Sequence, residues 1–144
     1  MVWPTGGGAA TNAGIDFQAR VAAYFMTHMA LEMPISTLNL IEFNSYPVEI
    51  FFETSKSVDD INVHLSDKTT LLIQAKRTVN LSESQESDFG KSLKQFIADY
   101  ASSGSKSNVY ILAIGSGSSS KVRCVLKKIL NSIRANKKGL TVMC

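Results

Sequence analysis

Residues 58–77 read VDDINVHL, SDKTT and LLIQAKR in turn. The first and third runs alternate apolar and polar residues and the second is short and polar, so the stretch predicts a β-hairpin with a loop at residues 66–70. Because side chains alternate between the two faces of a strand, one face of this hairpin is apolar. We expect that face to pack against the core through Ile61, Val63, Ile73 and Ala75.

The other face of the hairpin gathers polar side chains. A loop of this length sets Asn62 opposite Gln74 and Asp60 opposite Lys76, with His64 on the same face. A carboxylate, an amide and an ammonium group therefore converge at the open end of the hairpin. We take this cluster as the candidate active site, although an Asp–Lys pair across two strands is also ordinary in sheets and contributes only about 0.2–1 kcal/mol.

The composition fits one domain that can bury a core. The 144 residues are 44% hydrophobic and 19% charged, with a net charge of +3. No apolar run approaches the roughly 20 residues of a membrane-spanning helix, and the N-terminus lacks the pattern of a secretory signal. Cys124 and Cys144 make no disulfide framework, and with two histidines they are too few for a typical structural zinc site. We expect a cytoplasmic protein with no membrane association.

The order of the expected elements defines the fold class. Residues 1–12 are rich in small residues and predict a flexible lead-in to a single domain at 13–144. The elements expected after it are a helix at 14–32, strands at 38–43 and 48–54, the hairpin, a helix at 88–100, a strand at 109–114, a helix at 120–135 and a strand from 140. This order predicts an α/β (α+β) fold in which helices flank a central mixed β-sheet. The last strand ends abruptly, which indicates the N-terminal part of a longer protein.

The polar cluster offers the groups that a metal-dependent phosphodiesterase uses. Mg²⁺ or Mn²⁺ binds oxygen ligands, and hydrolysis also needs a group that handles the attacking water and positive charge for the transition state. Asp60 supplies a carboxylate, Gln74 an amide oxygen and Ala75 a backbone carbonyl. Lys76 shares their face and is placed to act on the water or on the scissile phosphate.

Two motifs resemble the core of the PD-(D/E)xK nuclease superfamily, in its Mrr-like branch: VDDINV at 58–63 and LIQAKR at 72–77. That branch often carries Gln-x-Lys in the second motif. The segment Gly14–Arg20 also resembles the first helix of nuclease domains fused to bacterial antiphage defence effectors. The resemblance covers most of the chain and implies a restriction-endonuclease-like core. The activity that it implies is that of a Mg²⁺-dependent DNA endonuclease in a defence or restriction system, joined to a C-terminal sensing or motor domain and able to form homo-oligomers.

The same resemblance implies roles for single residues. Asp60 becomes the metal-binding aspartate, Gln74 the second motif residue and Lys76 the catalytic lysine. Asp59 competes with Asp60, which we prefer because strand alternation puts it on the face of Gln74 and Lys76. The commonest family pattern has an acid where this chain has Gln74, so we expect weaker metal binding. The accessory candidates are Gln18 in the first helix and Glu53.

Positive charge gathers late in the chain, where residues 121–144 carry seven basic residues and no acid. Such a segment can bind the phosphates of double-stranded DNA without reading its sequence, or can simply be a solvated helix face. The candidate phosphate contacts are Arg77, Lys121, Arg123, Lys127 and Lys128. Two further functions stay open: an inactive nucleic-acid-binding or oligomerisation module that keeps the nuclease fold, and an RNA-cleaving variant.

Overall fold

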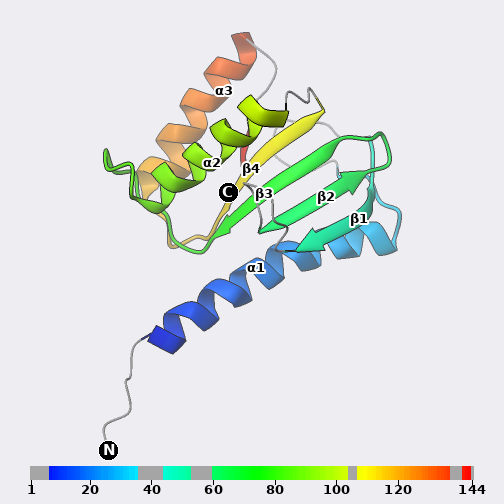
Figure 1. Cartoon of the computed structure of the whole chain (residues 1–144), viewed down its shortest axis with the longest axis horizontal. Coiled ribbons are helices and arrows are strands. Elements are labelled where there is room, and N and C mark those ends of the chain that lie inside the picture. Colours follow the sequence, from blue (N-terminus) through cyan, green and yellow to red (C-terminus); the bar gives the residue numbers. More distant parts are fainter. Residues whose placement is uncertain (1–6, 36–43, 53–59, 104–106, 137–140, 144) are drawn as a thin grey trace, which may run out of the picture.

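A five-stranded mixed sheet forms the centre of the protein (Figure 1). The computed structural model describes residues 7–35, 44–52, 60–103, 107–136 and 141–143. The strands, in both chain and sheet order, are β1 (Pro47–Phe52), β2 (Ile61–Leu65), β3 (Thr70–Lys76), β4 (Asn108–Ile114) and β5 (Thr141–Met143). The first three pair antiparallel, whereas β3, β4 and β5 pair parallel. The prediction of a mixed sheet with flanking helices is confirmed.

Helices cover both faces of this sheet. The described helices are α1 (Gly7–Ala30), α2 (Asp88–Ser103), a π-helical segment η1 (Lys121–Leu126) and α3 (Lys127–Asn136). Figure 1 shows α1 across one face and α2 and α3 over the other. Because α2 leads from β3 to β4 and α3 from β4 to β5, the parallel pairs are joined by the helical crossovers that such pairs require.

The core consists of two apolar layers, one on each side of the sheet. Phe25 of α1 is fully buried against the face that carries Ile61 and Ile73, as the sequence predicts for that face of the hairpin. On the opposite face Phe96 of α2 packs with Leu72 and other apolar side chains of β3 and β4. β4 is buried from Tyr110 to Ile114, so the prediction of a strand covered on both faces is confirmed.

The hairpin forms, but its predicted register is wrong by two residues. Asn62 pairs with Leu72 rather than with Gln74. The last pair is Ile61 with Ile73, and continuing this register by one residue brings Asp60 level with Gln74 rather than with Lys76. The cause is a shorter turn: Thr70 already belongs to β3, and Lys68 takes a left-handed backbone conformation with φ of 70°. Because a shift of two residues preserves side-chain alternation, every predicted face is kept.

The first helix begins earlier than predicted. α1 starts at Gly7 rather than near Gly14, so residues 7–12 of the expected flexible lead-in are helical. Glycine is a poor helix former, but extending an existing helix adds one hydrogen bond for each residue that is fixed, so propagation overcomes weak propensity. Residues 1–6 and the predicted strand at 38–43 lie outside the described residues.

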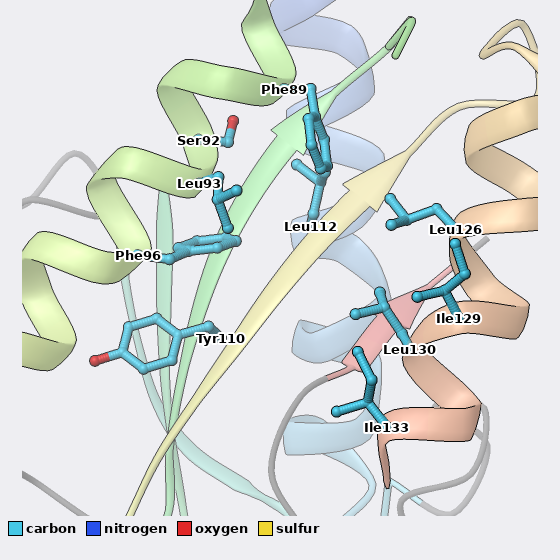
Figure 2. A pocket seen from close by; sticks show the side chains of 10 residues that line it. All are labelled: Phe89, Ser92, Leu93, Phe96, Tyr110, Leu112, Leu126, Ile129, Leu130 and Ile133. Carbon is cyan, nitrogen blue, oxygen red and sulfur yellow. The ribbon is translucent and has the colours of Figure 1, made fainter. Parts of the chain in front are cut away.

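The helices on the second face leave an apolar cavity of about 230 Å³. In Figure 2, side chains of α2, β4 and α3 converge on it, among them Phe96, Leu112 and Ile133. The polar groups in its lining are two hydroxyls: that of Ser92 donates to the backbone carbonyl of Asp88, and that of Tyr110 donates to Asp99. Both hydroxyls are thus engaged in hydrogen bonds within the protein, and the other lining residues are apolar.

Candidate active site

Asp60 joins three segments that are distant in the sequence. Its carboxylate Oδ2 accepts a hydrogen bond from the backbone N–H of Ala75 at 2.8 Å. Its backbone carbonyl accepts a second bond, at 3.1 Å, from the side-chain amide of Gln18. The residue that precedes β2 is thus tied to the end of β3 and to α1, and Gln18 lies beside Asp60, as expected from the sequence.

The backbone of Ala75 brings a second oxygen, its own carbonyl, to the side of β3 on which Asp60 lies. In an antiparallel ladder the N–H and C=O groups of one residue point to the same neighbouring strand. Since the Ala75 N–H points to Asp60, the carbonyl of Ala75 faces the side of β3 on which Asp60 lies. An ionised carboxylate accepts more than one hydrogen bond, so Asp60 keeps capacity for a further partner.

Gln74 carries an unusual buried oxygen. The residue is 1% exposed, and its side-chain Oε1 has no hydrogen-bond partner among the described residues. A buried polar atom without a partner costs about 1–3 kcal/mol, and native proteins retain few of them. Gln74 shares its face of β3 with Leu72, so α2 and its apolar layer cover the face that the hairpin pattern alone leaves polar.

Lys76 closes β3 on the same face as Gln74. It is partly buried, and its backbone carbonyl accepts a hydrogen bond from the N–H of Gly115 at 3.2 Å. In the part of the chain that the structure describes, Lys76 makes no ion pair with Asp60. The predicted Asp60–Lys76 cross-strand pair is therefore wrong, because the register places Lys76 beyond the level of Asp60.

Two other polar residues of the hairpin differ in their surroundings. Asn62 is buried at 1% exposure in β2. His64, near the turn, binds Glu49 of β1 through its Nδ1 atom at 2.9 Å. Two candidates, Asp59 and Glu53, lie outside the described residues.

The oxygen ligands proposed for a metal ion are one charged and two neutral. Among the residues placed by the structure, no group of three or more His, Cys, Asp or Glu side chains could hold a metal ion. The candidate set is instead the carboxylate of Asp60, the side-chain oxygen of Gln74 and the backbone carbonyl of Ala75. All three are the hard oxygen donors that Mg²⁺ prefers, and the unpartnered Gln74 oxygen fits a ligand role.

Part of the basic segment reaches the same end of the sheet. The loop after β4 contacts the segment after β3, since the N–H of Val79 donates to the Ser118 hydroxyl at 3.0 Å. The segment η1 starts directly after this loop, with Lys121 exposed and the Arg123 Nε donating to the Ser118 carbonyl at 2.9 Å. Exposed Arg77 follows β3 at this end as well.

The remaining two predicted phosphate contacts lie further along the chain. Lys127 and Lys128 begin α3, one partly buried and the other exposed. The basic helix predicted at 120–135 is therefore present, but its first turn is π-helical. Arg77, Lys121 and Arg123 are thus the predicted phosphate contacts that lie near the end of β3 and the loop beside it.

Sequence reasoning missed two residues that shape the site. Arg20 lies in the same part of α1 as Gln18 and lines a small pocket with Arg77. Gly115, the residue after β4, lies so close to the backbone of Arg77 that a Cβ atom there would overlap the Arg77 carbonyl. A glycine directly after a buried strand was the available signal for such a close approach, whereas nothing in the linear sequence pairs Arg20 with Arg77.

Comparisons with protein-family models, with curated proteins and with solved structures find no match to this chain. None of the helices in the described ranges combines the length and the hydrophobicity that crossing a membrane requires.

Proposed function

We propose that this chain is a metal-dependent nuclease domain with a restriction-endonuclease-like core, which hydrolyses phosphodiester bonds of DNA. The observation that carries the proposal is the contact between the Asp60 carboxylate and the Ala75 backbone, beside the orphaned oxygen of Gln74. The order of helix, antiparallel hairpin, crossover helix and parallel strand supports it. So does the resemblance of the motifs at 58–63 and 72–77 to the PD-(D/E)xK superfamily.

Each residue of the site has a distinct role in this proposal. Asp60, Gln74 and the Ala75 carbonyl would hold a Mg²⁺ or Mn²⁺ ion, which, when bound, supplies Lewis acidity at the scissile phosphate. Lys76 orients the attacking water or offsets the negative charge that develops on the phosphate. Gln18 acts through Asp60, because its hydrogen bond fixes the backbone from which that carboxylate projects.

The charge distribution and the resemblance support a wider role within this proposal. Double-stranded DNA is held without sequence readout by Arg77, Lys121, Arg123, Lys127 and Lys128. The domain is the cytoplasmic effector of an antiphage defence or restriction system. Its proposed controls are homo-oligomeric assembly and a sensing or motor domain of the same protein, as the resemblance implies.

One observation favours a second function. A single carboxylate in the described site, with an amide where the family commonly has an acid, is a weak charge complement for a divalent cation. A chain that lost cleavage would remain a nucleic-acid-binding or oligomerisation module with the same fold. This alternative keeps the basic contacts and gives Asp60 a purely structural role.

Cleavage assays separate these functions. Supercoiled plasmid and a single-stranded RNA are incubated with the wild type, Lys76→Ala and Lys68→Ala, in Mg²⁺, Mn²⁺ or EDTA. Lys68→Ala is the control, because it removes the same charge from the hairpin turn, at the opposite end of β3 from Lys76. The nuclease proposal expects metal-dependent DNA cleavage that Lys76→Ala abolishes and Lys68→Ala preserves. Undiminished cleavage by Lys76→Ala would contradict it, and salt-sensitive binding without products would favour the module.

A further inference from the structure

A small polar pocket lies on the α1 side of the candidate active site. Its volume is about 140 Å³, and its lining joins one segment of α1 to the residue that follows β3. The lining residues are Ala13, Asp16, Phe17, Arg20 and Arg77. Two guanidinium groups from distant parts of the sequence thus share one pocket.

The position of the pocket is fixed by contacts already described. Gln18, which binds the Asp60 backbone, lies between Phe17 and Arg20 on α1. Arg77 directly follows Lys76, and strand alternation directs these two side chains to opposite faces. Close packing of Gly115 against the Arg77 carbonyl holds this backbone in place. The pocket therefore adjoins the site from one face of the sheet, while Lys76 adjoins it from the other.

The charged groups in the pocket leave donors available for an anion. Arg20 binds Asp16 at 2.9 Å, one helical turn away, but the two side chains are 77% and 61% exposed. Exposed pairs at this spacing contribute only about 0.3–0.5 kcal/mol. A guanidinium carries five N–H donors, so Arg20 retains donors beyond the one used, and its planar fork matches phosphate oxygens. Two arginines against one carboxylate leave the pocket positive.

We propose that Arg20 and Arg77 form a phosphate subsite, which holds a backbone phosphate of the nucleic acid next to the scissile one. The inference rests on the proposed function, because it takes the ligand to be the same polynucleotide. Both guanidinium groups contact one phosphate. The strand then crosses the end of β3, with one phosphate at the pocket and the next at Lys76.

Binding measured without catalysis tests the subsite. The proteins are the wild type, Arg20→Gln, Arg77→Gln, the double variant and the matched control Lys68→Gln. Fluorescence anisotropy of a labelled DNA duplex is followed in EDTA over a series of KCl concentrations, after circular dichroism has confirmed folding. Loss of one phosphate contact reduces the slope of log K against log salt by about one, and we expect about tenfold weaker binding at low salt.

The outcomes separate this proposal from the nuclease assignment. If the double variant loses affinity and slope while Lys68→Gln does not, the subsite stands, even where the wild type yields no cleavage products. If the double variant binds with the affinity and slope of Lys68→Gln, the subsite is wrong, even where the wild type cleaves DNA. Failure of the wild type to bind the duplex would also overturn it.

Discussion

The Asp60 carboxylate and the backbone N–H of Ala75 are joined by a 2.8 Å hydrogen bond, which ties the residue before β2 to the end of β3. One side chain thus serves two purposes: it satisfies a backbone amide near the end of β3, and it supplies the one carboxylate that the described residues bring to the candidate site. A substitution that removes both the hydrogen bond and the negative charge would not show which of the two causes its effect. The side chain chosen must therefore keep the hydrogen bond and remove only the charge.

Asparagine at position 60 makes that separation. Its amide oxygen can still accept from the Ala75 N–H, so we expect Asp60→Asn to unfold in denaturant within about 1 kcal/mol of the wild type. Its loss of negative charge should lower metal-dependent cleavage at least about 100-fold, because Mg²⁺ favours an anionic oxygen ligand. Asp60→Ala leaves the amide without its partner and should cost about 1–2 kcal/mol in addition. Wild-type cleavage by Asp60→Asn would remove Asp60 from the chemistry.

The hairpin shows what local sequence pattern can predict. Alternation of apolar and polar residues over 58–77 was enough to predict both strands and both faces, since the faces depend only on parity. The register depended on the turn, where Lys68 adopts a left-handed conformation that a lysine gives no reason to predict. Asp60 was therefore placed opposite Lys76 instead of level with Gln74.

The burial of the site depended on contacts that no local pattern contains. Gln74 was expected on an open polar face, but α2 covers that face and leaves the residue 1% exposed. Gln18 was expected at the site from its motif, and it does contact Asp60. Arg20 was missed because its neighbour Arg77 comes from another element, which only the tertiary packing of α1 brings near.

Two glycines should respond to alanine in opposite ways. A Cβ atom on Gly115 would overlap the Arg77 carbonyl, so Gly115→Ala should lower the free energy of unfolding by about 1–3 kcal/mol and reduce cleavage by moving Lys76. Gly14, inside α1, has no atom within 4 Å of the added Cβ. Gly14→Ala should raise stability by about 0.5–1 kcal/mol with unchanged cleavage. Urea unfolding measures both, and a neutral Gly115→Ala would show that the contact relaxes freely.

A buried tyrosine predicts alkaline sensitivity of the second apolar layer. The Tyr110 hydroxyl donates to Asp99 Oδ2 at 2.7 Å, and both residues are buried. Burial, and then the hydrogen bond to Asp99, raise the pKa of Tyr110 above its ordinary value of 10.0. The folded state thus holds the proton more tightly, so this contribution to stability is complete below pH 10 and lost as pH rises through the raised pKa.

Tyr110→Phe tests this linkage. The variant leaves Asp99 buried without its partner, so we expect a loss of about 1–3 kcal/mol at neutral pH. Because it cannot titrate, its melting temperature should fall less than that of the wild type between neutral pH and pH values above 10. Tyr100→Phe, at a side chain that is 66% exposed on the same helix as Asp99, is the matched control and should keep the wild-type profile. If the melting temperatures of all three proteins fall in parallel above pH 10, Tyr110 is not the source of the alkaline sensitivity.

The Gln74→Glu variant tests whether the buried oxygen at this position faces a metal ion. Burial raises the pKa of a carboxyl group at a position that is 1% exposed. Once the pH exceeds the ordinary pKa of a glutamate, the unfolded state therefore binds fewer protons than the folded state. In EDTA the variant should therefore lose stability as pH rises from about 4.3 through the raised pKa. A divalent cation beside Asp60 would reverse this penalty, because two carboxylates hold it more tightly than one. Mg²⁺ should then raise the melting temperature of Gln74→Glu more than that of the wild type.

The control at this position is leucine, which removes the orphaned oxygen and nearly preserves volume. Gln74→Leu should keep the stability of the wild type within about 1 kcal/mol, since it removes the unpartnered Oε1 together with the rest of the amide group. It should also lose metal-dependent cleavage and any response of its melting temperature to Mg²⁺. If Mg²⁺ shifts Gln74→Glu no more than Gln74→Leu, the ion does not reach position 74. Metal binding would then rest on Asp60 and the Ala75 carbonyl alone, too weak a set of ligands for the proposed chemistry.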